Sequence, residues 1–196
     1  MKSIVLASGS PRRKELLERL VPEFQVLIDE SPEEKIQGEL PQETVKRLAL
    51  QKAENVFKRV NTPSIIIAAD TVVAIDNKIL GKPKDKKEAF DMLKTLSGRQ
   101  HQVFTGIALI DGENVVSSYE TTKVKFKDLT DAEIYAYIDT KEPMDKAGAY
   151  GIQEIGALLI EGIDGDYFNV VGLPLCRLGR ILKENFGVDL LKNNNR

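Results

Sequence analysis

Apolar residues along this chain fall into short continuous runs, typical of buried strands, and longer stretches with helical spacing. The first run is Ser3–Ala7, and Lys14–Leu20 follows with leucines at helical intervals, which predicts a strand and then a helix. A second short strand is predicted over Phe24–Ile28. A helix is predicted over Pro41–Val60, where apolar residues recur every three to four positions. The chain therefore opens as strand, helix, strand and helix.

One predicted strand, Ser64–Val73, carries a charge inside an otherwise apolar run. Its composition is that of a strand buried on both faces, and Asp70 alone interrupts it with a carboxylate. An unpaired buried carboxylate is costly, so Asp70 needs a metal ion, a cationic side chain or a cavity beside it. The alternative is a structural ion pair with a lysine, but such a pair adds little to the stability of a core. The pattern favours a functional carboxylate.

The rest of the chain is predicted to form mostly antiparallel strands and short helices. The first predicted elements are a hairpin over Ala74–Leu80, a helix over Lys86–Leu96, and strands Arg99–Ile110 and Val115–Phe126 around an Asp111-Gly112 turn. They are followed by a helix ending at Ile138, a strand over Ala157–Ile160 and a turn over Gly162–Asp166. A helix from Pro174 to about Gly187 and a disordered tail from Lys192 to Arg196 complete the chain. Thr130 and Glu133 form a capping-box sequence ahead of the second of these helices. This order of elements indicates an α/β chain with a mixed sheet flanked by helices.

Length and charge narrow the class of protein. A chain of 196 residues suits one domain, or two lobes that share a cleft, and we expect a single domain over residues 1–196. The formal net charge of −2 provides no general basic field, so nucleic acid is not expected as a partner. The single cysteine, Cys176, excludes an intrachain disulfide and suits a reducing compartment. No apolar run approaches the ~20 residues of a membrane span, and the chain opens on its strand without a signal-peptide pattern, so we expect a cytoplasmic protein without a membrane partner.

The turn Ser8–Arg13, between the first predicted strand and helix, has the composition of an anion site. Ser10 can serve as N-cap with Pro11 in the first turn, where the missing N–H costs nothing. Backbone N–H groups, two serine hydroxyls and the guanidinium groups of Arg12 and Arg13 would then converge at a helix N-terminus, which suits phosphate. The alternative is an ordinary turn with surface arginines.

Three further charged segments are candidates for the same site. The acidic stretch Asp29–Glu34 follows the second strand; it is either a solvated loop or a source of carboxylates for Mg²⁺ or Mn²⁺ beside a phosphate. Lys52 falls on the apolar stripe of its helix, four residues after Leu48, so it must be paired, reach a cavity or extend to the rim of the stripe. Lys82, between a glycine and a proline, would be held at a fixed point.

Two other features bear on the chemistry. His101 is the only histidine, so serine–histidine catalysis and histidine-cluster metal sites are poorly supported, and we expect it to be a hydrogen-bonded structural residue. The segment Glu142–Gln153 is dense in glycine and in paired opposite charges, and loops of this length in a compact domain are commonly functional.

Six motifs in a fixed order give the chain a specific resemblance. These motifs are Ser8–Arg13, Ala68–Thr71, Gly81–Pro83, Gly98–Gly106, Glu142–Gln153 and Gly165–Pro174. Through them the chain resembles the Maf family of nucleoside triphosphate pyrophosphatases along nearly its whole length, least at Pro32–Pro41 and the tail. The resemblance implies a cytoplasmic, house-cleaning hydrolase that uses a divalent cation to cleave a nucleoside triphosphate to the monophosphate and pyrophosphate. It also implies an elongated α/β fold with a deep cleft between two lobes, related to inosine triphosphatases, and often a homodimer.

The resemblance also implies roles for single residues. Arg13, Thr71 and Gln153 stand at positions associated with the dTTP/UTP branch rather than the 7-methyl-GTP branch, and a glutamine amide can both donate to and accept from a pyrimidine. Asp70 would act as general base or hold the attacking water through the cation, and the sequence leaves both roles open. The residues expected to bind the triphosphate are Ser8, Arg12, Arg13, Lys52 and Lys82, and those expected to hold Mg²⁺ or Mn²⁺ are Glu33 and Asp70.

Other functions stay open on the sequence alone. The physiological substrate is expected among standard and modified pyrimidine nucleotides. The family's link to inhibited septum formation leaves a non-catalytic, nucleotide-responsive regulator of cell division as the main alternative. A phosphatase that releases orthophosphate is a third interpretation.

Overall fold

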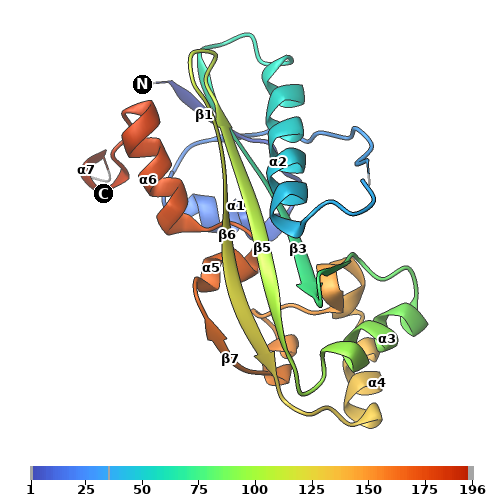
Figure 1. Cartoon of the computed structure of the whole chain (residues 1–196). Coiled ribbons are helices and arrows are strands. Elements are labelled where there is room, and N and C mark those ends of the chain that lie inside the picture. The colour runs from blue at the N-terminus through green and yellow to red at the C-terminus, as the bar shows by residue number, and fades with distance from the viewer. Residues whose placement is uncertain (1, 35, 194–196) are drawn as a thin grey trace. The chain divides into compact units, whose positions relative to one another are not determined.

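The computed structural model describes residues 2–34 and 36–193. The chain forms a mixed β-sheet with helices around it (Figure 1). The strands of the seven-stranded sheet are β1 (Ser3–Leu6), β2 (Gln25–Val26), β3 (Ser64–Ile75), β4 (Lys78–Leu80), β5 (Gln100–Ile110), β6 (Val115–Phe126) and β7 (Ile160–Asp164). Their order is β2-β1-β3-β5-β6-β7, with β4 paired to β3. β1 is parallel to β2 and β3, whereas β4 and β7 pair antiparallel to β3 and β6. The predicted fold class, a mixed sheet flanked by helices, is confirmed.

Seven α-helices and three short 3₁₀ helices are present in the described residues. They are α1 (Pro11–Glu18), α2 (Pro41–Phe57), α3 (Lys86–Leu96), α4 (Asp131–Asp139), α5 (Tyr167–Val171), α6 (Leu175–Phe186), α7 (Leu190–Asn193), η1 (Glu142–Asp145), η2 (Ala147–Ala149) and η3 (Ile155–Leu159). In the described part of the chain, none of these helices is long and apolar enough to cross a membrane.

The chain divides into two compact units. The first comprises Met1–Asp70, Thr105–Glu120 and Gly172–Arg196, and the second comprises Thr71–Phe104 and Thr121–Val171. The long strands β3, β5 and β6 each contribute residues to both units. The expectations of a single domain over residues 1–196 and of a deep cleft between two lobes stay predictions.

In the first unit, α2 packs closely on the sheet (Figure 1). Alanines on the helix, on β3 and β5 and directly after β1 keep the two surfaces close. The buried cluster is Val5, Ala7, Ala49, Ala53, Val56, Ile66, Ala68, Ala108 and Ile110. Gly106 of β5 faces the helix backbone, and a Cβ at this position would lie 2.2 Å from the carbonyl oxygen of Val45. Only glycine therefore fits there. The close contact at Gly106 sets the distance between α2 and the sheet, and so the position of Lys52 relative to the sheet.

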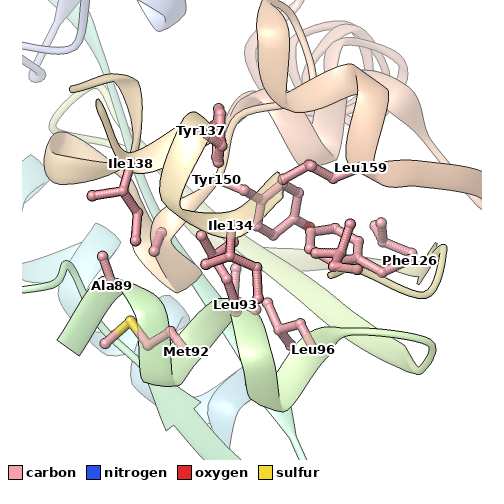
Figure 2. Close-up of a cluster of buried hydrophobic side chains, with 14 of the residues drawn as sticks. Ala89, Met92, Leu93, Leu96, Phe126, Ile134, Tyr137, Ile138, Tyr150 and Leu159 are labelled. Atoms are coloured by element: carbon pink, nitrogen blue, oxygen red, sulfur yellow. The ribbon is translucent and has the colours of Figure 1, made fainter. Parts of the chain in front are cut away.

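The second unit has its own apolar core between α3, α4 and the sheet. Figure 2 shows Leu93 and Leu96 of α3 and Ile134 of α4 directed toward the rings of Phe126 and Tyr150, all of them buried. Phe126 and Tyr150 meet edge to face, with ring centroids 4.8 Å apart. The apolar spacing predicted for α3 thus becomes one face of a packed core.

Local signals predict the ends of several elements correctly. α3 has the predicted bounds and is followed by Gly98 at φ +69°, as a C-terminal glycine cap requires. At α4 the Thr130 side chain accepts the N–H of Glu133, and the Glu133 carboxylate accepts the Thr130 N–H at 2.8 Å, which confirms the capping box. Asp76 and Asn77, both at positive φ, turn β3 into β4.

The strand predicted over Ala157–Ile160 and the turn predicted over Gly162–Asp166 are wrong. The apolar run forms the 3₁₀ helix η3, in which Leu158 is 72% exposed, and the strand β7 begins only at Ile160 and ends at Asp164. β7 pairs with β6 through backbone hydrogen bonds at the end of the strand order, and its Glu161 forms an ion pair with Lys125 at 2.6 Å. A strand of this kind does not need an apolar sequence, so hydropathy misplaced it.

Two short helices also differ from the expectations. α5 forms in a segment where the pattern predicts no element. α7 includes Lys192 and Asn193 of the tail predicted to be disordered, and residues 194–196 lie outside the described residues.

His101 is a buried structural residue, as predicted. Its Nε2 lies 2.7 Å from the Tyr150 hydroxyl, and its ring meets Phe126 edge to face with centroids 5.0 Å apart. Nδ1 is buried and has no hydrogen-bond partner among the described residues. Burial disfavours the charged imidazolium and lowers the pKa of His101 from 6.5 to about 4.

This shift predicts a pH-dependent stability. Between pH 6.5 and 4 the unfolded chain binds a proton at His101 that the folded chain does not, so the free energy of unfolding falls as the pH falls through this window. The loss from this residue is about 3 kcal/mol at pH 4, and above pH 6.5 it contributes no pH dependence. Urea unfolding of the wild type and His101→Gln at several pH values measures it as the difference between the two proteins. A constant difference from pH 7 to 4 would contradict the assignment.

Candidate functional site

The turn between β1 and α1 adopts the predicted arrangement, with one change in its hydrogen bonds. Ser10 occupies the N-cap position with extended backbone, and Pro11 is in the first turn of α1. In the described part of the chain, however, the Ser10 side chain makes no capping hydrogen bond. The buried Ser8 hydroxyl oxygen instead accepts the Ser10 N–H at 3.3 Å and the Arg13 NH1 at 3.2 Å. Ser8 therefore holds both the turn and the arginine in place.

Arg13 is anchored at both ends of its guanidinium group. Nε donates to the Gly172 carbonyl oxygen at 2.8 Å, while NH1 donates to Ser8. Burial lowers the pKa of Arg13, while the negative charge of Asp70 raises it, Arg12 lowers it and Glu33 raises it. Asp70, Arg12 and Glu33 thus all lie within electrostatic reach of Arg13.

Lys52 of α2 connects two of the predicted carboxylates. Its Nζ lies 2.5 Å from Oδ1 of Asp70 and 2.7 Å from Oε1 of Glu33. The side chain of Lys52 is 17% exposed and that of Asp70 is 11% exposed, whereas Glu33 is half-exposed at 51%. Of the interpretations considered for Lys52, the paired one is correct. The cation required beside Asp70 is present.

We call this group the Asp70 cluster. Its members, all in the first unit, are Ser8, Arg12, Arg13, Glu33, Lys52 and Asp70. An ion pair between Asp70 and Lys52 alone fits a purely structural role equally well. The second carboxylate on the same ammonium and the anchored Arg13 make the cluster more than a pair, and they favour a site that handles charged ligands.

The cluster fits a divalent cation that shares its ligands with a substrate. Glu33 and Asp70 both direct an oxygen at a single positive centre, the Lys52 ammonium. Mg²⁺ is commonly held by one or two carboxylates together with water and substrate phosphates. Within the ranges 2–34 and 36–193, no group of three or more histidine, cysteine, aspartate or glutamate side chains is placed to hold a metal ion.

The other predicted binding residues belong to the second unit. Thr71 follows Asp70 in β3 and is half-buried. Lys82 and Gln153 are exposed in loops, and the loop of Lys82 is tied down by the Gly148 N–H, which donates to the Gly81 carbonyl oxygen at 3.0 Å. That these three residues bind the same ligand as the Asp70 cluster stays a prediction.

The loop Glu142–Gln153 owes its order to charged residues near its start. Oε1 of Glu142 accepts the Tyr137 hydroxyl at 2.9 Å, and its two oxygens accept the N–H groups of Ile155 and Gly156 at 3.1 and 3.2 Å. The buried Lys146 donates to the Glu142 carbonyl oxygen at 2.7 Å. The paired charges of this loop therefore serve its folding, and they hold the segment that ends at Gln153.

Sequence reasoning missed two groups that support the cluster. One is the carbonyl of Gly172, which lies 159 residues from Arg13 along the chain and is reached only through the fold. The other is a polar stripe on α2, formed by Arg47, Gln51 and Asn55, which contacts the acidic segment before the helix. Its spacing of four residues was visible in the sequence.

Comparison with known proteins identifies the family. Residues 3–185 match the model of the family described as Maf-like protein. This chain belongs to the Maf family. The resemblance predicted from the six motifs is therefore confirmed.

Two relatives in the Maf family align over almost the whole chain. A protein of Acetivibrio thermocellus named dTTP/UTP pyrophosphatase is 55% identical over 203 residues, covering 98% of this chain and 99% of the relative. A protein of Clostridioides difficile with the same name is 52% identical over 190 residues, covering 96% and 97%. Among solved structures, the Ham1 protein of Staphylococcus aureus matches with a TM-score of 0.48 and 17% identity over 65% of this chain and 73% of that one.

The ion pairs of α2 predict a difference between two lysines. Lys52→Met leaves Asp70 buried beside no ammonium group and is expected to lower the free energy of unfolding by roughly 3 to 5 kcal/mol. Lys46 of the same helix pairs with the exposed Glu43 at 2.9 Å, so Lys46→Met should cost less than about 1 kcal/mol. Urea unfolding at pH 7 measures both. Equal losses in the two variants would contradict the importance of the buried pair.

Proposed function

We propose that this protein is a nucleoside triphosphate pyrophosphatase that hydrolyses dTTP and UTP to the monophosphate and pyrophosphate. Its membership of the Maf family and its near full-length relatives named dTTP/UTP pyrophosphatase support the reaction class. The structural observation that carries the proposal is the buried carboxylate of Asp70, paired with the Lys52 ammonium and within electrostatic reach of Arg13. A buried acid among cations suits attack by water on an anionic substrate.

A divalent cation, Mg²⁺ or Mn²⁺, is part of the proposal. Glu33 and Asp70 would hold it together with the phosphates of the substrate. When bound, such a cation neutralises charge on the phosphates and polarises the phosphorus centre toward attack. Oδ1 of Asp70 is paired with Lys52, so the proton of the attacking water would pass to Oδ2, unless Asp70 serves mainly to hold the cation.

Cationic side chains would bind the triphosphate. Arg12, Arg13, Lys52 and Lys82 would bind its oxygens and offset the charge that grows on the leaving pyrophosphate. Ser8 contributes by fixing Arg13, to which its hydroxyl is bonded. Holding Arg13 by Ser8 and Gly172 before the ligand arrives reduces the rotamer entropy that binding must remove.

The remaining predictions complete the proposal. Thr71 and Gln153 would recognise the pyrimidine, whose edge a glutamine amide can meet as donor and acceptor. Modified pyrimidine triphosphates are included among the substrates, consistent with a house-cleaning role. The protein would act in the cytoplasm, where a chain with one cysteine, the exposed Cys176, needs no disulfide, and a homodimer is the proposed assembly.

A substrate panel tests the reaction directly. The purified protein is incubated with Mg²⁺ or Mn²⁺ and with dTTP, UTP, the other common triphosphates and modified pyrimidine triphosphates, and pyrophosphate and orthophosphate are both assayed. Pyrophosphate release that is highest with dTTP and UTP supports the proposal. Orthophosphate release would instead indicate a phosphatase, and nucleotide binding without hydrolysis would indicate the regulator.

Asp70→Asn tests the role of the carboxylate. The variant keeps the shape of the side chain but removes its charge, so it should bind UTP with a Kd within about threefold of the wild type and lower kcat at least about a hundredfold. The matched control is Asp76→Asn in the exposed turn after β3, where the lost ion pair with Arg99 should leave kcat unchanged. Near-normal turnover by Asp70→Asn would remove Asp70 from the mechanism.

A further inference from the structure

The acidic segment that carries Glu33 has no secondary structure of its own. From Leu27 to Glu34 the backbone forms neither helix nor strand. Among the backbone hydrogen bonds there, the Leu27 N–H donates to the Leu6 carbonyl oxygen at 3.1 Å. A half-exposed glutamate on such a segment has no fixed position unless side chains elsewhere hold the chain around it. The structure shows what holds it.

On the N-terminal side of Glu33, Asn55 of α2 anchors the acidic segment through hydrogen bonds. Its Nδ2 donates to the Ser31 hydroxyl oxygen at 3.0 Å and to Oδ2 of Asp29 at 3.3 Å. The Ser31 hydroxyl in turn donates to Oδ2 of Asp29 at 2.7 Å, so the three side chains form a closed network. One turn earlier, Gln51 Nε2 contacts the Pro32 carbonyl oxygen at 3.4 Å. Glu33 is the next residue.

On the C-terminal side of Glu33, Arg47 of α2 anchors the acidic segment through hydrogen bonds. Its NH2 donates to the Glu34 carbonyl oxygen at 3.0 Å. The same guanidinium binds the Glu39 carboxylate through two bonds, Nε to Oε1 at 2.8 Å and NH2 to Oε2 at 2.7 Å. Thr44 donates to Glu39 at 2.9 Å. Glu33 thus lies between two anchor points on one helix.

The spacing on α2 explains how one helix supplies all of these contacts. Arg47, Gln51 and Asn55 are four residues apart, so they follow one another along one face of the helix, and Arg59, just after it, continues the series to the Ile28 carbonyl oxygen at 2.8 Å. Lys52 follows Gln51 and contacts Glu33. Figure 1 shows the segment before α2, in blue, running beside this helix.

We propose that the polar stripe of α2, defined as Arg47, Gln51 and Asn55, positions Glu33 to bind the divalent cation at the Asp70 cluster. The inference rests on the proposed function only in giving Glu33 a cation to bind. These three are positioning residues, because they donate hydrogen bonds to the acidic segment and not to Asp70. Partners of this kind around a metal ligand typically change metal affinity ten- to a hundredfold.

The negative charge of Asp29 sets the direction of the hydrogen bonds among Asp29, Ser31 and Asn55. Burial works to raise the pKa of Asp29, but hydrogen bonds from Ser31 and Asn55 and the charge of Lys52 together hold this pKa below its usual value. Asp29 is therefore an acceptor at neutral pH, and the direction of every bond in the network is defined: Asn55 and Ser31 donate to it. A reversed network can be built from the same two residue types.

Exchanging the two residues tests the proposal. Asn55→Asp places a carboxylate against Asp29 and should release the segment, whereas Asp29→Asn combined with Asn55→Asp restores one donor and one acceptor in reversed order. The control is Glu54→Gln, an exposed position of α2 beside Asn55. Four quantities are measured: the Kd of Mn²⁺ for the protein saturated with a non-hydrolysable UTP analogue, the hydrogen exchange of residues 28–34, and kcat and KM with UTP.

The expected pattern separates positioning from stability. Asn55→Asp should weaken Mn²⁺ binding at least about tenfold, speed exchange of residues 28–34 and lower kcat, and the double variant should return Mn²⁺ affinity to within about threefold of the wild type. Glu54→Gln should match the wild type throughout. If Asn55→Asp does not fold, Asn55→Ala takes its place with the same expectation.

Three outcomes would overturn the inference. They are unchanged Mn²⁺ affinity in a variant whose segment exchanges faster, failure of the double variant to recover, and a wild-type protein that binds no Mn²⁺. Failure of the proposed function is distinct from these. In that case the wild type hydrolyses no triphosphate, while Asn55→Asp weakens Mn²⁺ binding and the double variant restores it. That result would support the positioning role of the polar stripe and contradict the proposed enzymatic function.

Discussion

The structure of the first unit depends on keeping one carboxylate charged inside a buried strand. Asp70 is 8% exposed at the end of a run of buried residues in β3, and water cannot solvate it well there. Lys52 must therefore approach from α2, and α2 comes close enough because Gly106 leaves no side chain beneath it. The charge of Asp70 is thus met by a lysine on an otherwise apolar stripe, on a helix that a glycine in β5 lets approach the sheet.

The same charge organises the residues around it. The Asp70 cluster contains three cations, Arg12, Arg13 and Lys52, and two carboxylates, Glu33 and Asp70, so it carries a small positive excess before a ligand binds. A triphosphate brings more negative charge than this excess, which is why a divalent cation suits the site. The anchoring of Arg13 by Ser8 and Gly172 and the support of Glu33 by α2 fix these charges in advance, as electrostatic catalysis requires.

Hydrogen bonds between polar side chains help to order the second unit. His101 and Tyr150 bond to each other inside an aromatic core, and Glu142 accepts three hydrogen bonds that close the loop leading to Gln153. Polar groups bonded in this way favour one arrangement of a core, since an alternative packing would break these bonds.

The sequence by itself determined what depends on neighbours along the chain. The capping box of Thr130, the glycine after α3 and the turn at Asp76-Asn77 are local, and so is the conflict that marks Asp70 as unusual. The fold alone decided which partners meet: Lys52 with both carboxylates, Arg13 with Gly172, and the polar stripe of α2 with the acidic segment. β7 belongs to the second group, because its place on β6 is set by backbone pairing between distant segments, which leaves no signature in local hydropathy.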